Sequence, residues 1–369
     1  MTMILDGTNG ATFNDGSLQA AAASPYVLKN RIINGDMRID QRNAGAAVTI
    51  NSAAYTFVVD RWSGYGSAAD GVFTLQRSTT APTGFTNSFL ATVTTADASI
   101  GASQLYIIEQ FIEGFNVADL DFGTANAKTI TISFWVRSSV TGTFSGSIAD
   151  TNYTRSYPFT YTISSANTFE YKTVTIAGDT TGTWNKDNGI GMRLYFDLGS
   201  GSSTKATAGA WTGSGTVGAT GSTNLIATNG ATFYITGVQL EQNTSATPFE
   251  RRLYNQELAN CQRYYLKLNS GAQTLYTSFG AGVAYNTTVA SITINYPVQM
   301  RGLPTYNYGG SLRLVGSAGI AATSSSLGNT SYLSSYVDVT VASGLTTGGA
   351  YWFGPNGDST AFIAFSAEL

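Results

Sequence analysis

The stretch FYITGVQLEQNTSATPFERRLYNQELANCQRYY, residues 233–265, decides how this chain is organised. It begins as a strand in which Phe233 and Ile235 face one side, and it then passes through a polar turn. The remainder predicts a helix, the only convincing one in the chain. Its apolar stripe would consist of Tyr254, Leu258, Cys261 and Tyr265. Because the flanking sequence is rich in Gly and Thr, we interpret this stretch as the closing strand of one β domain followed by a helical connector to a second.

The composition favours an all-β protein. Charged residues make up 11% of the 369 residues, whereas roughly 25% is usual in soluble proteins. Gly, Thr, Ser and Asn take the surface positions that Lys and Glu would normally hold, which suits strands and turns better than helices. A neutral surface of this kind is typical of chains that form subunit interfaces.

Several classes of function are excluded by what the sequence lacks. The formal net charge is −3 without any run of Lys or Arg, so nucleic-acid binding is not expected. We expect neither a secretory signal nor a membrane-spanning segment, since no apolar run has the length that either requires. The sequence has no histidine, so it cannot supply a Ser-His-Asp triad or a histidine-ligated zinc site. The single cysteine, Cys261, is predicted to be a buried thiol.

Residues 1–25 form an N-terminal leader rich in Asp-Gly and Asn-Gly turn dipeptides. Its few apolar residues cannot build a core by themselves. Phe13 and Leu18 would be exposed to water in an isolated chain, so we expect another subunit to order the leader, with disorder as the alternative.

Residues 26–247 are predicted to form a β-sandwich, because short alternating strands are separated by Gly and Asn turns. The clearest strand, TITISFWVRS, would bury Ile130, Ile132, Phe134 and Val136. The strand GMRLYFDLGS repeats this design and would bury Met192, Leu194, Phe196 and Leu198. Trp211 lies in a long Gly- and Ser-rich loop, where we expect it to cap a sheet edge.

The remaining chain is predicted to hold the connecting helix, residues 248–268, and a second β-sandwich, residues 269–369. No fixed short repeat is present, which argues against a β-helix. The fold class is therefore all-β: a leader, a sandwich, a short helix and a C-terminal sandwich.

Three phrases of the first domain resemble the jelly rolls of carbohydrate-binding modules of the family 4/9 type. They are NRIINGDMRIDQR with DRW downstream, TISFWVRSS, and FYITGVQLE. The block GVQLE…PFERR…CQRYY, continued by PVQMRGLPT, resembles the core of bacteriophage tail-fibre and virion-surface proteins, including cyanophage ones. The leader phrase FNDGSLQ is similar to an attachment region of such fibres.

This resemblance implies a phage virion protein, made in the host cytoplasm and located at the virion surface on the tail or head. It implies a homotrimer that contacts other virion proteins through its leader and host-cell polysaccharide through its jelly roll. The family's closing strand often carries an acidic ligand for a structural calcium ion, and Gly237 takes that place here. Asp36 and Glu241 remain as calcium candidates, and no other cofactor is implied.

Candidate glycan-binding residues are outward-facing aromatic and polar side chains, because a sugar ring packs its CH face on an aromatic ring while its hydroxyls need polar partners. They are Trp135 and Arg137 on one strand, Arg193, Tyr195 and Asp197 on the other, and Trp184 in a loop. The alternative is that these side chains pack on a sister subunit or on the long loop of residues 199–221.

Three functions remain open. The leading hypothesis is a non-catalytic fibre that adheres to host glycans, and the second is a purely structural virion component without a ligand. A polysaccharide depolymerase is the third, because Glu109 and Glu113 offer a carboxylate pair and a glycosidase needs two such groups across a cleft.

Overall fold

The computed structural model describes all residues except 1–3, 7–9, 13–17, 20–28, 52 and 272–275. Within the described residues, strands dominate and one α-helix is present, so the predicted all-β class is confirmed. Part of the leader forms a small antiparallel sheet of β1 (Ile4–Asp6), β2 (Gly10–Thr12) and β3 (Leu18–Gln19). Phe13 lies outside the described residues, and the ordering of the leader by another subunit stays a prediction.

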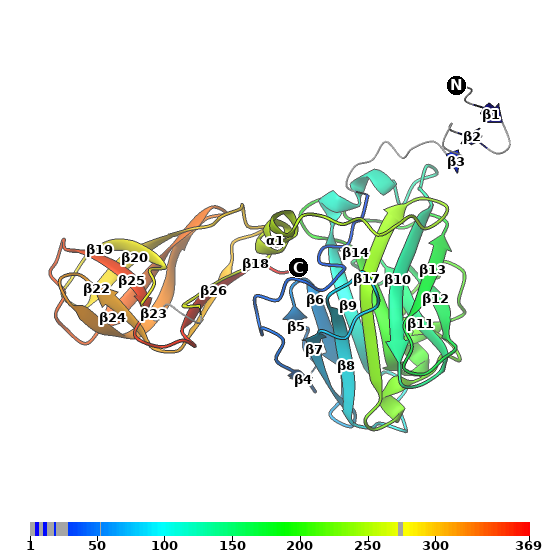
Figure 1. Cartoon of the computed structure of the whole chain (residues 1–369), viewed down its shortest axis with the longest axis horizontal. Coiled ribbons are helices and arrows are strands. Elements are labelled where there is room, and N and C mark those ends of the chain that lie inside the picture. Colours follow the sequence, from blue (N-terminus) through cyan, green and yellow to red (C-terminus); the bar gives the residue numbers. More distant parts are fainter. Residues whose placement is uncertain (1–3, 7–9, 13–17, 20–28, 52, 272–275) are drawn as a thin grey trace.

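The first domain is a sandwich of two six-stranded antiparallel sheets in a jelly-roll arrangement (Figure 1). The first, here called the β10 sheet, has the order β13 (Glu170–Ile176), β10 (Ile130–Ser138), β17 (Thr232–Gln242), β8 (Ser88–Thr95), β7 (Val72–Ser78) and β4 (Val48–Ile50). The second, here called the β14 sheet, has the order β12 (Ser156–Ile163), β11 (Gly142–Ala149), β14 (Ile190–Ser200), β9 (Leu105–Glu113), β6 (Trp62–Gly66) and β5 (Thr56–Val59).

The core between the sheets is formed by the side chains that alternation predicts. All eight apolar residues expected to point inward from β10 and β14 are buried. Phe134 and Phe196 meet across the two sheets with ring centroids 5.1 Å apart in an edge-to-face arrangement. Each fully buried side chain of this size contributes about 1.5–3 kcal/mol, which makes this interior the main source of the domain's stability.

Short elements connect the strands. They are the 3-10 turns η1 (Gly114–Asn116), η2 (Ala118–Leu120), η3 (Ser202–Thr204) and η4 (Leu225–Ala227), and a parallel pair of β15 (Lys205–Ala206) and β16 (Gly218–Ala219). Trp211 donates from Nε1 to the carbonyl of Ala177, directly after β13, at 2.8 Å. It therefore covers a sheet edge, as expected.

The helix α1 (Tyr254–Gln262) is shorter than its apolar stripe predicts. Cys261 is fully buried, as expected, and packs in a small cluster with Ile33, Ile39 and Tyr264. Two members of the predicted stripe were assigned wrongly. Tyr254 is 54% exposed, and Tyr265 begins the next strand, because the chain leaves the helix after Gln262 and pairs with the C-terminal strand.

The C-terminal part differs in one respect from the expected sandwich, because six of its strands close into a barrel. The barrel order is β19 (Gly280–Ala284), β20 (Val289–Asn295), β24 (Ser334–Val341), β23 (Gly319–Thr330), β22 (Leu312–Val315) and β25 (Ala350–Pro355). A three-stranded sheet of β18 (Tyr265–Asn269), β26 (Phe362–Ser366) and β21 (Thr305–Gly309) lies between the barrel and the sandwich (Figure 1). Alternation within a strand does not reveal whether the outermost strands pair, so closure was not predictable.

Buried ion pairs join the two parts. The carboxylate of Glu368, near the C-terminus, binds Arg42 at 2.7 Å and also pairs with the buried Arg61. Arg263, directly after α1, forms a two-pronged contact with Glu113 of β9 at 2.5 and 2.9 Å. Both ends of the C-terminal part are therefore attached to the sandwich by charge-assisted hydrogen bonds, which are among the stronger polar contacts in proteins.

Candidate functional site

The candidate site lies on the outer surface of the β10 sheet, where β17 contains a bulge. Between Ser133 and Trp135, the register of β10 against β17 shifts by one residue. Gly237 takes the left-handed conformation there, with φ of 62°. A Cβ atom at Gly237 would lie 2.7 Å from Cζ of Phe85 and 3.2 Å from Cδ1 of Trp135. Glycine therefore lets two aromatic side chains approach the strand closely.

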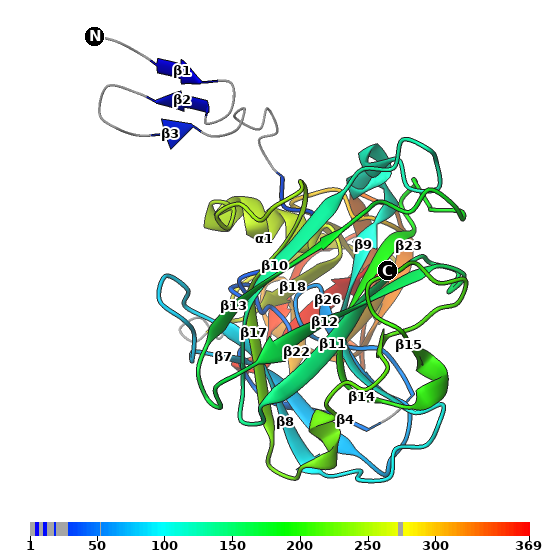
Figure 2. The same ribbon diagram turned by 90° about the vertical axis from the view of Figure 1, so that its right-hand side faces the viewer.

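Two pairs of aromatic rings surround this bulge. Trp135 and Tyr171 are directly opposite each other on β10 and β13, with ring centroids 5.4 Å apart (Figure 2 shows these strands side by side). Phe85 and Phe249 come from two loops and meet edge to face at 5.3 Å. Tyr171 is 44% exposed, and Trp135 is half-buried. The rings are thus partly accessible to solvent while their positions are fixed by strand pairing and packing.

An open groove of about 610 Å³ lies among these rings. Its lining residues are Thr83, Phe85, Trp135, Tyr171, Gly237, Ala246, Thr247, Pro248, Phe249 and Arg251. Aromatic faces with a few hydroxyl groups and a guanidinium at one wall form the kind of surface that packs against a hydroxylated ring. Among the described residues that line the groove, none is acidic.

Two arginines lie beside the groove, each stacked on a pair of rings. The Arg251 guanidinium lies 4.6 Å from the ring centroid of Phe85 and 5.7 Å from that of Phe249. Arg137, two residues after Trp135 on the same face of β10, lies 4.9 Å from the Tyr234 ring and 5.9 Å from the Phe169 ring. Stacking of this kind fixes a guanidinium without using its hydrogen-bond donors.

The structure places the other strand of candidate residues on a covered surface. Arg193, Tyr195 and Asp197 point outward from the β14 sheet, as the alternation predicts, but all three are buried. The Arg193 guanidinium lies between the rings of Phe111 and Tyr153, at 4.6 and 4.5 Å. These three side chains therefore lie in a buried layer on the outer side of the β14 sheet, where other segments cover them.

Asp197 is held entirely by protein donors. Its Oδ1 accepts from the Gly199 amide at 2.9 Å and the Ser200 hydroxyl at 2.7 Å. Its Oδ2 accepts from Ser145 at 3.1 Å and lies 3.3 Å from Nζ of Lys205. A carboxylate with this many donors is a structural anchor of the β14 surface.

Glu109 lies under the same surface with an incomplete set of partners. Ser63 donates to its Oε1 at 3.3 Å, and its Oε2 has no hydrogen-bond partner among the described residues. Burial raises the pKa of the Glu109 carboxyl to about 8, and Arg193 and Ser63 offset part of that rise. The group is thus protonated over much of the neutral range.

The carboxylate pair proposed for a depolymerase is not presented to a cleft. Glu109 is buried as described, and Glu113 is occupied by Arg263 and by the Tyr264 hydroxyl at 2.5 Å. Burial would raise the pKa of Glu113, but the hydrogen bonds from Arg263 and Tyr264 outweigh it and lower the pKa. A glycosidase needs one carboxyl that protonates the leaving group and a second that acts beside it on the substrate, and neither residue reaches a substrate here.

Trp184 is also removed from solvent. It packs edge to face with Phe122 at 5.0 Å and with Trp211 at 5.6 Å. Its Nε1 donates to Asp179 at 3.2 Å. This candidate therefore belongs to a cluster that seals the side of the sandwich.

The two calcium candidates are occupied by protein donors. Asp36 pairs with Arg38 at 2.5 Å. Glu241 accepts from the amide and hydroxyl of Thr247 and from the Gln239 side chain. No group of three or more acidic or sulfur ligands that would suit a metal ion occurs in the part of the chain that the structure describes. The residues present do not fit a calcium ion, which takes six to eight oxygen ligands.

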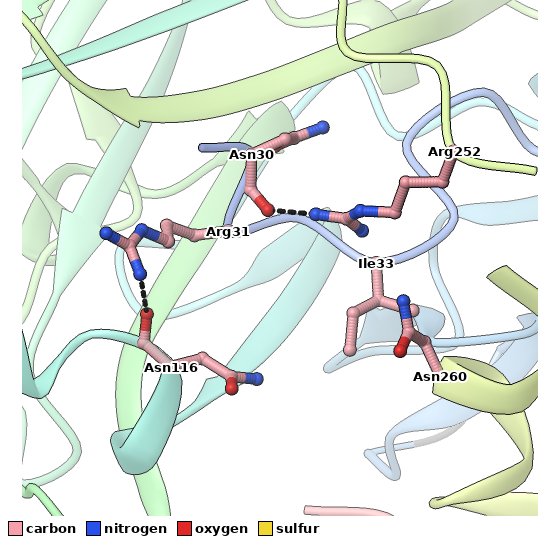
Figure 3. Close-up of a pocket in the computed structure, with 6 residues that line it drawn as sticks. All are labelled: Asn30, Arg31, Ile33, Asn116, Arg252 and Asn260. Atoms are coloured by element: carbon pink, nitrogen blue, oxygen red, sulfur yellow. Dashed lines mark hydrogen bonds between the residues drawn. The ribbon is translucent and has the colours of Figure 1, made fainter. Parts of the chain in front are cut away.

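A second, smaller pocket of about 180 Å³ lies where the start of the sandwich meets the connector (Figure 3). In it, Arg252 donates to the carbonyl of Asn30, and Arg31 donates to the carbonyl of Asn116 at 3.2 Å. Ile33 and Asn260 complete the lining. Because both arginines already donate to the protein's own carbonyls, we interpret these contacts as attaching the connector to the start of the sandwich.

The sequence identified one wall of the groove and missed the other. Trp135 lines the groove and Arg137 lies two residues further along the same strand, whereas Phe85, Tyr171, Phe249 and Arg251 were not predicted. The available signal was Gly237: a glycine that interrupts the strongest closing strand indicates a bulge or a close approach by another side chain.

No protein-family profile matches this chain, and no curated protein matches it. Several solved structures share part of its arrangement. The enzymatically active domain of tailspike protein 4 from bacteriophage CBA120 aligns with 60% of this chain at 14% identity and a TM-score of 0.32. The aligned part spans 22% of that tailspike chain.

Carbohydrate-binding modules are also found. A family 4 module aligns with 57% of this chain and 98% of its own length, at 16% identity and a TM-score of 0.27. A family 11 module of a Clostridium thermocellum cellulase aligns with 53% of this chain and 99% of its own length, at 10% identity and a TM-score of 0.27. The function has to be inferred from the site itself, since one fold hosts many functions. Among the described residues, no helix is long and apolar enough to cross a membrane.

Proposed function

We propose that this protein is a non-catalytic adhesion module of a virion-surface fibre, and that it binds host-cell glycans in the groove beside Trp135. The supporting observation is the groove itself. It combines the half-buried Trp135 ring and the exposed Tyr171 ring with the Thr83 hydroxyl and the Arg251 guanidinium. The assignment to a phage fibre is supported by the GVQLE…PFERR…CQRYY block.

The groove is suited to holding a sugar and not to cleaving one. A pyranose ring can pack its CH face against Trp135, while Thr83 and Arg251 lie at the edge where hydroxyl groups need partners. Proton transfer to a glycosidic oxygen requires an acid within hydrogen-bond reach, and the described lining residues contain no carboxyl group. The expected activity is therefore binding alone.

A homotrimer would make such binding effective, because one open site binds weakly. Three linked sites can raise apparent affinity by about 10²–10⁴ through effective concentration. The C-terminal barrel exposes the apolar side chains of Val283, Tyr285, Tyr332, Leu333 and Tyr336, which supports contact with other subunits. Light scattering should give three times the mass of the chain, and a monomer at micromolar concentration would contradict the homotrimer.

The glycan proposal is tested by screening the full chain on an array of bacterial surface polysaccharides, followed by titration of any bound glycan. Trp135→Ala should weaken binding about tenfold or more, as expected for an aromatic residue at the centre of an interface. Tyr254→Ala removes another exposed aromatic side chain, on α1, and should leave affinity unchanged. If wild type binds no glycan, or if Trp135→Ala binds as tightly as wild type, the proposal is wrong.

The second candidate is a purely structural virion component. The same exposed tyrosines of the barrel favour it, because they offer an interface without any ligand. It predicts the same trimer mass but no glycan binding, so the array distinguishes the two functions and light scattering tests the trimer that both require.

A further inference from the structure

We infer that the groove selects glycans that carry negative charge, such as uronic acids or sulfated sugars. This inference rests on the proposed function, and it names the class of sugar that the same site takes. The observation that carries it is a pair of arginines, Arg137 and Arg251, next to Trp135. Within the described residues neither guanidinium forms an ion pair or a hydrogen bond, although the chain contains more acidic than basic residues.

Arg251 forms one wall of the groove. It is exposed, and its guanidinium stacks on Phe85 at 4.6 Å and Phe249 at 5.7 Å. Its neighbours in the chain are used differently: Glu250 accepts from the Asn30 amide at 2.8 Å, and Arg252 pairs with Glu257 at 3.2 Å. Of the three charged residues 250–252, Arg251 is therefore the one whose side chain remains free for a ligand.

Arg137 occupies the other side of Trp135. Two residues along a strand share a face, so both side chains leave the β10 sheet in the same direction. Arg137 pairs in register with Tyr234, whereas Arg251 stacks on Phe85, which lies against Gly237 three residues further along β17. The two guanidiniums therefore flank the tryptophan along the strand direction.

Two of the nearby carboxylates are already paired with basic side chains. Asp36 feels the charge of Arg251, but it pairs with Arg38 at 2.5 Å. Glu170, next to Tyr171, pairs with Lys172 at 2.6 Å.

Glu241 is bound by Thr247, whose hydroxyl also accepts from Lys29. Glu241 thus keeps its negative charge, but Arg137, Arg251 and Lys29 form no ion pair within the described residues, so the surroundings of the groove keep a positive excess.

Arginine is well suited to this task. Its planar fork matches a carboxylate or sulfate with two parallel hydrogen bonds, and such charge-assisted bonds are roughly twice as strong as neutral ones. Because both guanidiniums are already stacked on rings, little side-chain freedom remains to be lost when an anion binds. A sugar stacked on Trp135 would bring its anionic substituents within reach of one arginine or the other.

The test compares matched polysaccharides on the full chain by calorimetry or biolayer interferometry. The probes are polygalacturonate for carboxylate, dextran sulfate for sulfate, dextran as the neutral polymer, and a single-stranded DNA oligonucleotide as an unrelated polyanion. Arg251→Gln and Arg137→Gln should each weaken binding of the preferred acidic glycan about tenfold. Neither change should alter the melting temperature by more than a few degrees, since both side chains lack protein hydrogen bonds.

A matched control exists in the C-terminal barrel. Arg313 stacks on Tyr276 at 4.4 Å and Trp352 at 5.3 Å, and it too forms no ion pair with any residue of the described chain. Arg313→Gln should leave glycan affinity unchanged. If Arg313→Gln weakens binding as much as Arg251→Gln does, the acidic site is not at Trp135 and the inference is overturned.

The outcomes separate this inference from the proposed function. Binding of dextran as tightly as the acidic polymers, with loss in Trp135→Ala, would keep the glycan site and refute its charge preference. Binding of DNA as tightly as the acidic glycans would also refute it, because the site would then respond to any polyanion. Absence of binding to every polymer would refute the proposed function itself.

Discussion

The two outer faces of the sandwich carry similar sequence patterns but differ in exposure to solvent. On β10, Trp135 and Arg137 remain accessible beside an open groove. On β14, Arg193, Tyr195 and Asp197 follow the same alternation and are buried. The difference is made by segments from elsewhere, since Tyr153 covers Arg193 and the loop around Val217 packs on Tyr195.

This contrast teaches that an outward-facing polar strand has two possible uses. An uncovered face keeps its aromatic and charged groups for a ligand, whereas a covered face uses them as internal anchors and must satisfy them with protein partners. The stability of the β14 surface should therefore be sensitive to changes in its polar residues, and the β10 surface should be sensitive mainly in binding. The predictions below follow from that difference, from the largest expected effect to the smallest.

The largest effect is expected from Asp197→Ala on the covered face. The change leaves Lys205 and several buried hydroxyl and amide donors without their acceptor, so the free energy of unfolding should fall by about 3–5 kcal/mol. Urea unfolding monitored by tryptophan fluorescence measures this loss. Asp121→Asn removes the charge of a half-exposed partner of Lys186 and keeps a residue type that tolerates the left-handed backbone at this position, so it should cost no more than about 1 kcal/mol. Equal losses in the two variants would contradict the buried-anchor role.

The next effect is a pH dependence from Glu109. The folded-state pKa is about 8, above the ordinary value of 4.5. The unfolded chain therefore binds fewer protons between these values, and the wild type should lose stability as pH rises through that window, by up to about 1.4 kcal/mol per pH unit. Glu109→Gln abolishes this titration, so its stability relative to wild type should increase from pH 5 to pH 8.

A control for that prediction lies on β13, at the edge of the β10 sheet. Burial alone would raise the pKa of Glu170, but the hydrogen bonds from Lys172 and from the amides of Ser165 and Ser164 lower it overall. The pH dependence of stability then has the opposite sign. Glu170 stabilises the fold above its ordinary pKa, and this contribution is lost as pH falls. Glu170→Gln should therefore be less stable than wild type near neutral pH, and the gap should close in acid. Parallel pH profiles for wild type and Glu109→Gln would refute the assignment.

A smaller effect is expected from Gly237→Ala at the bulge. A left-handed non-glycine residue costs roughly 1–2 kcal/mol, and the new methyl group also meets Phe85 at 2.7 Å. Gly230→Ala is the matched control, because it also has positive φ but nothing lies within 4 Å of its Cβ position. Gly237→Ala should be more destabilising than the control and should weaken glycan binding, whereas the control should leave binding intact. Equal binding by the two variants would show that the bulge does not shape the groove.

The smallest effect is expected from Tyr153→Ala, which uncovers Arg193. The variant loses the ring contact at 4.5 Å and the hydroxyl contact with Tyr55 at 2.8 Å. We expect a loss of about 1 kcal/mol in unfolding free energy and unchanged binding in the groove. Tyr254→Ala, at an exposed tyrosine of α1, should change stability by less than about 0.5 kcal/mol. A loss of glycan binding in Tyr153→Ala would mean that the covered face, and not the open one, holds the ligand.

The strands of the first domain were predictable because their signal is local. Ile130 to Val136 and Met192 to Leu198 alternate strictly, and both sets form the core. The groove was predictable only in part, since Phe85, Tyr171 and the segment of Phe249 and Arg251 come from three parts of the chain that are distant in sequence. Which face would be covered was not predictable at all, because the covering contact of Tyr153 with Arg193 depends on the path of a turn.

The double attachment of the C-terminal barrel has a mechanical consequence. Before the chain enters the barrel, Arg263 forms an ion pair with Glu113. After the chain leaves the barrel through β26, Glu368 forms ion pairs with Arg42 and Arg61. A force that pulls on the barrel is therefore divided between two anchor points, and bending at the junction requires both to open together. We expect the junction to resist shear, because both attachments must break before the two parts separate. Single-molecule stretching of Glu368→Gln should show separation at lower force than wild type, and an unchanged rupture force would contradict this expectation.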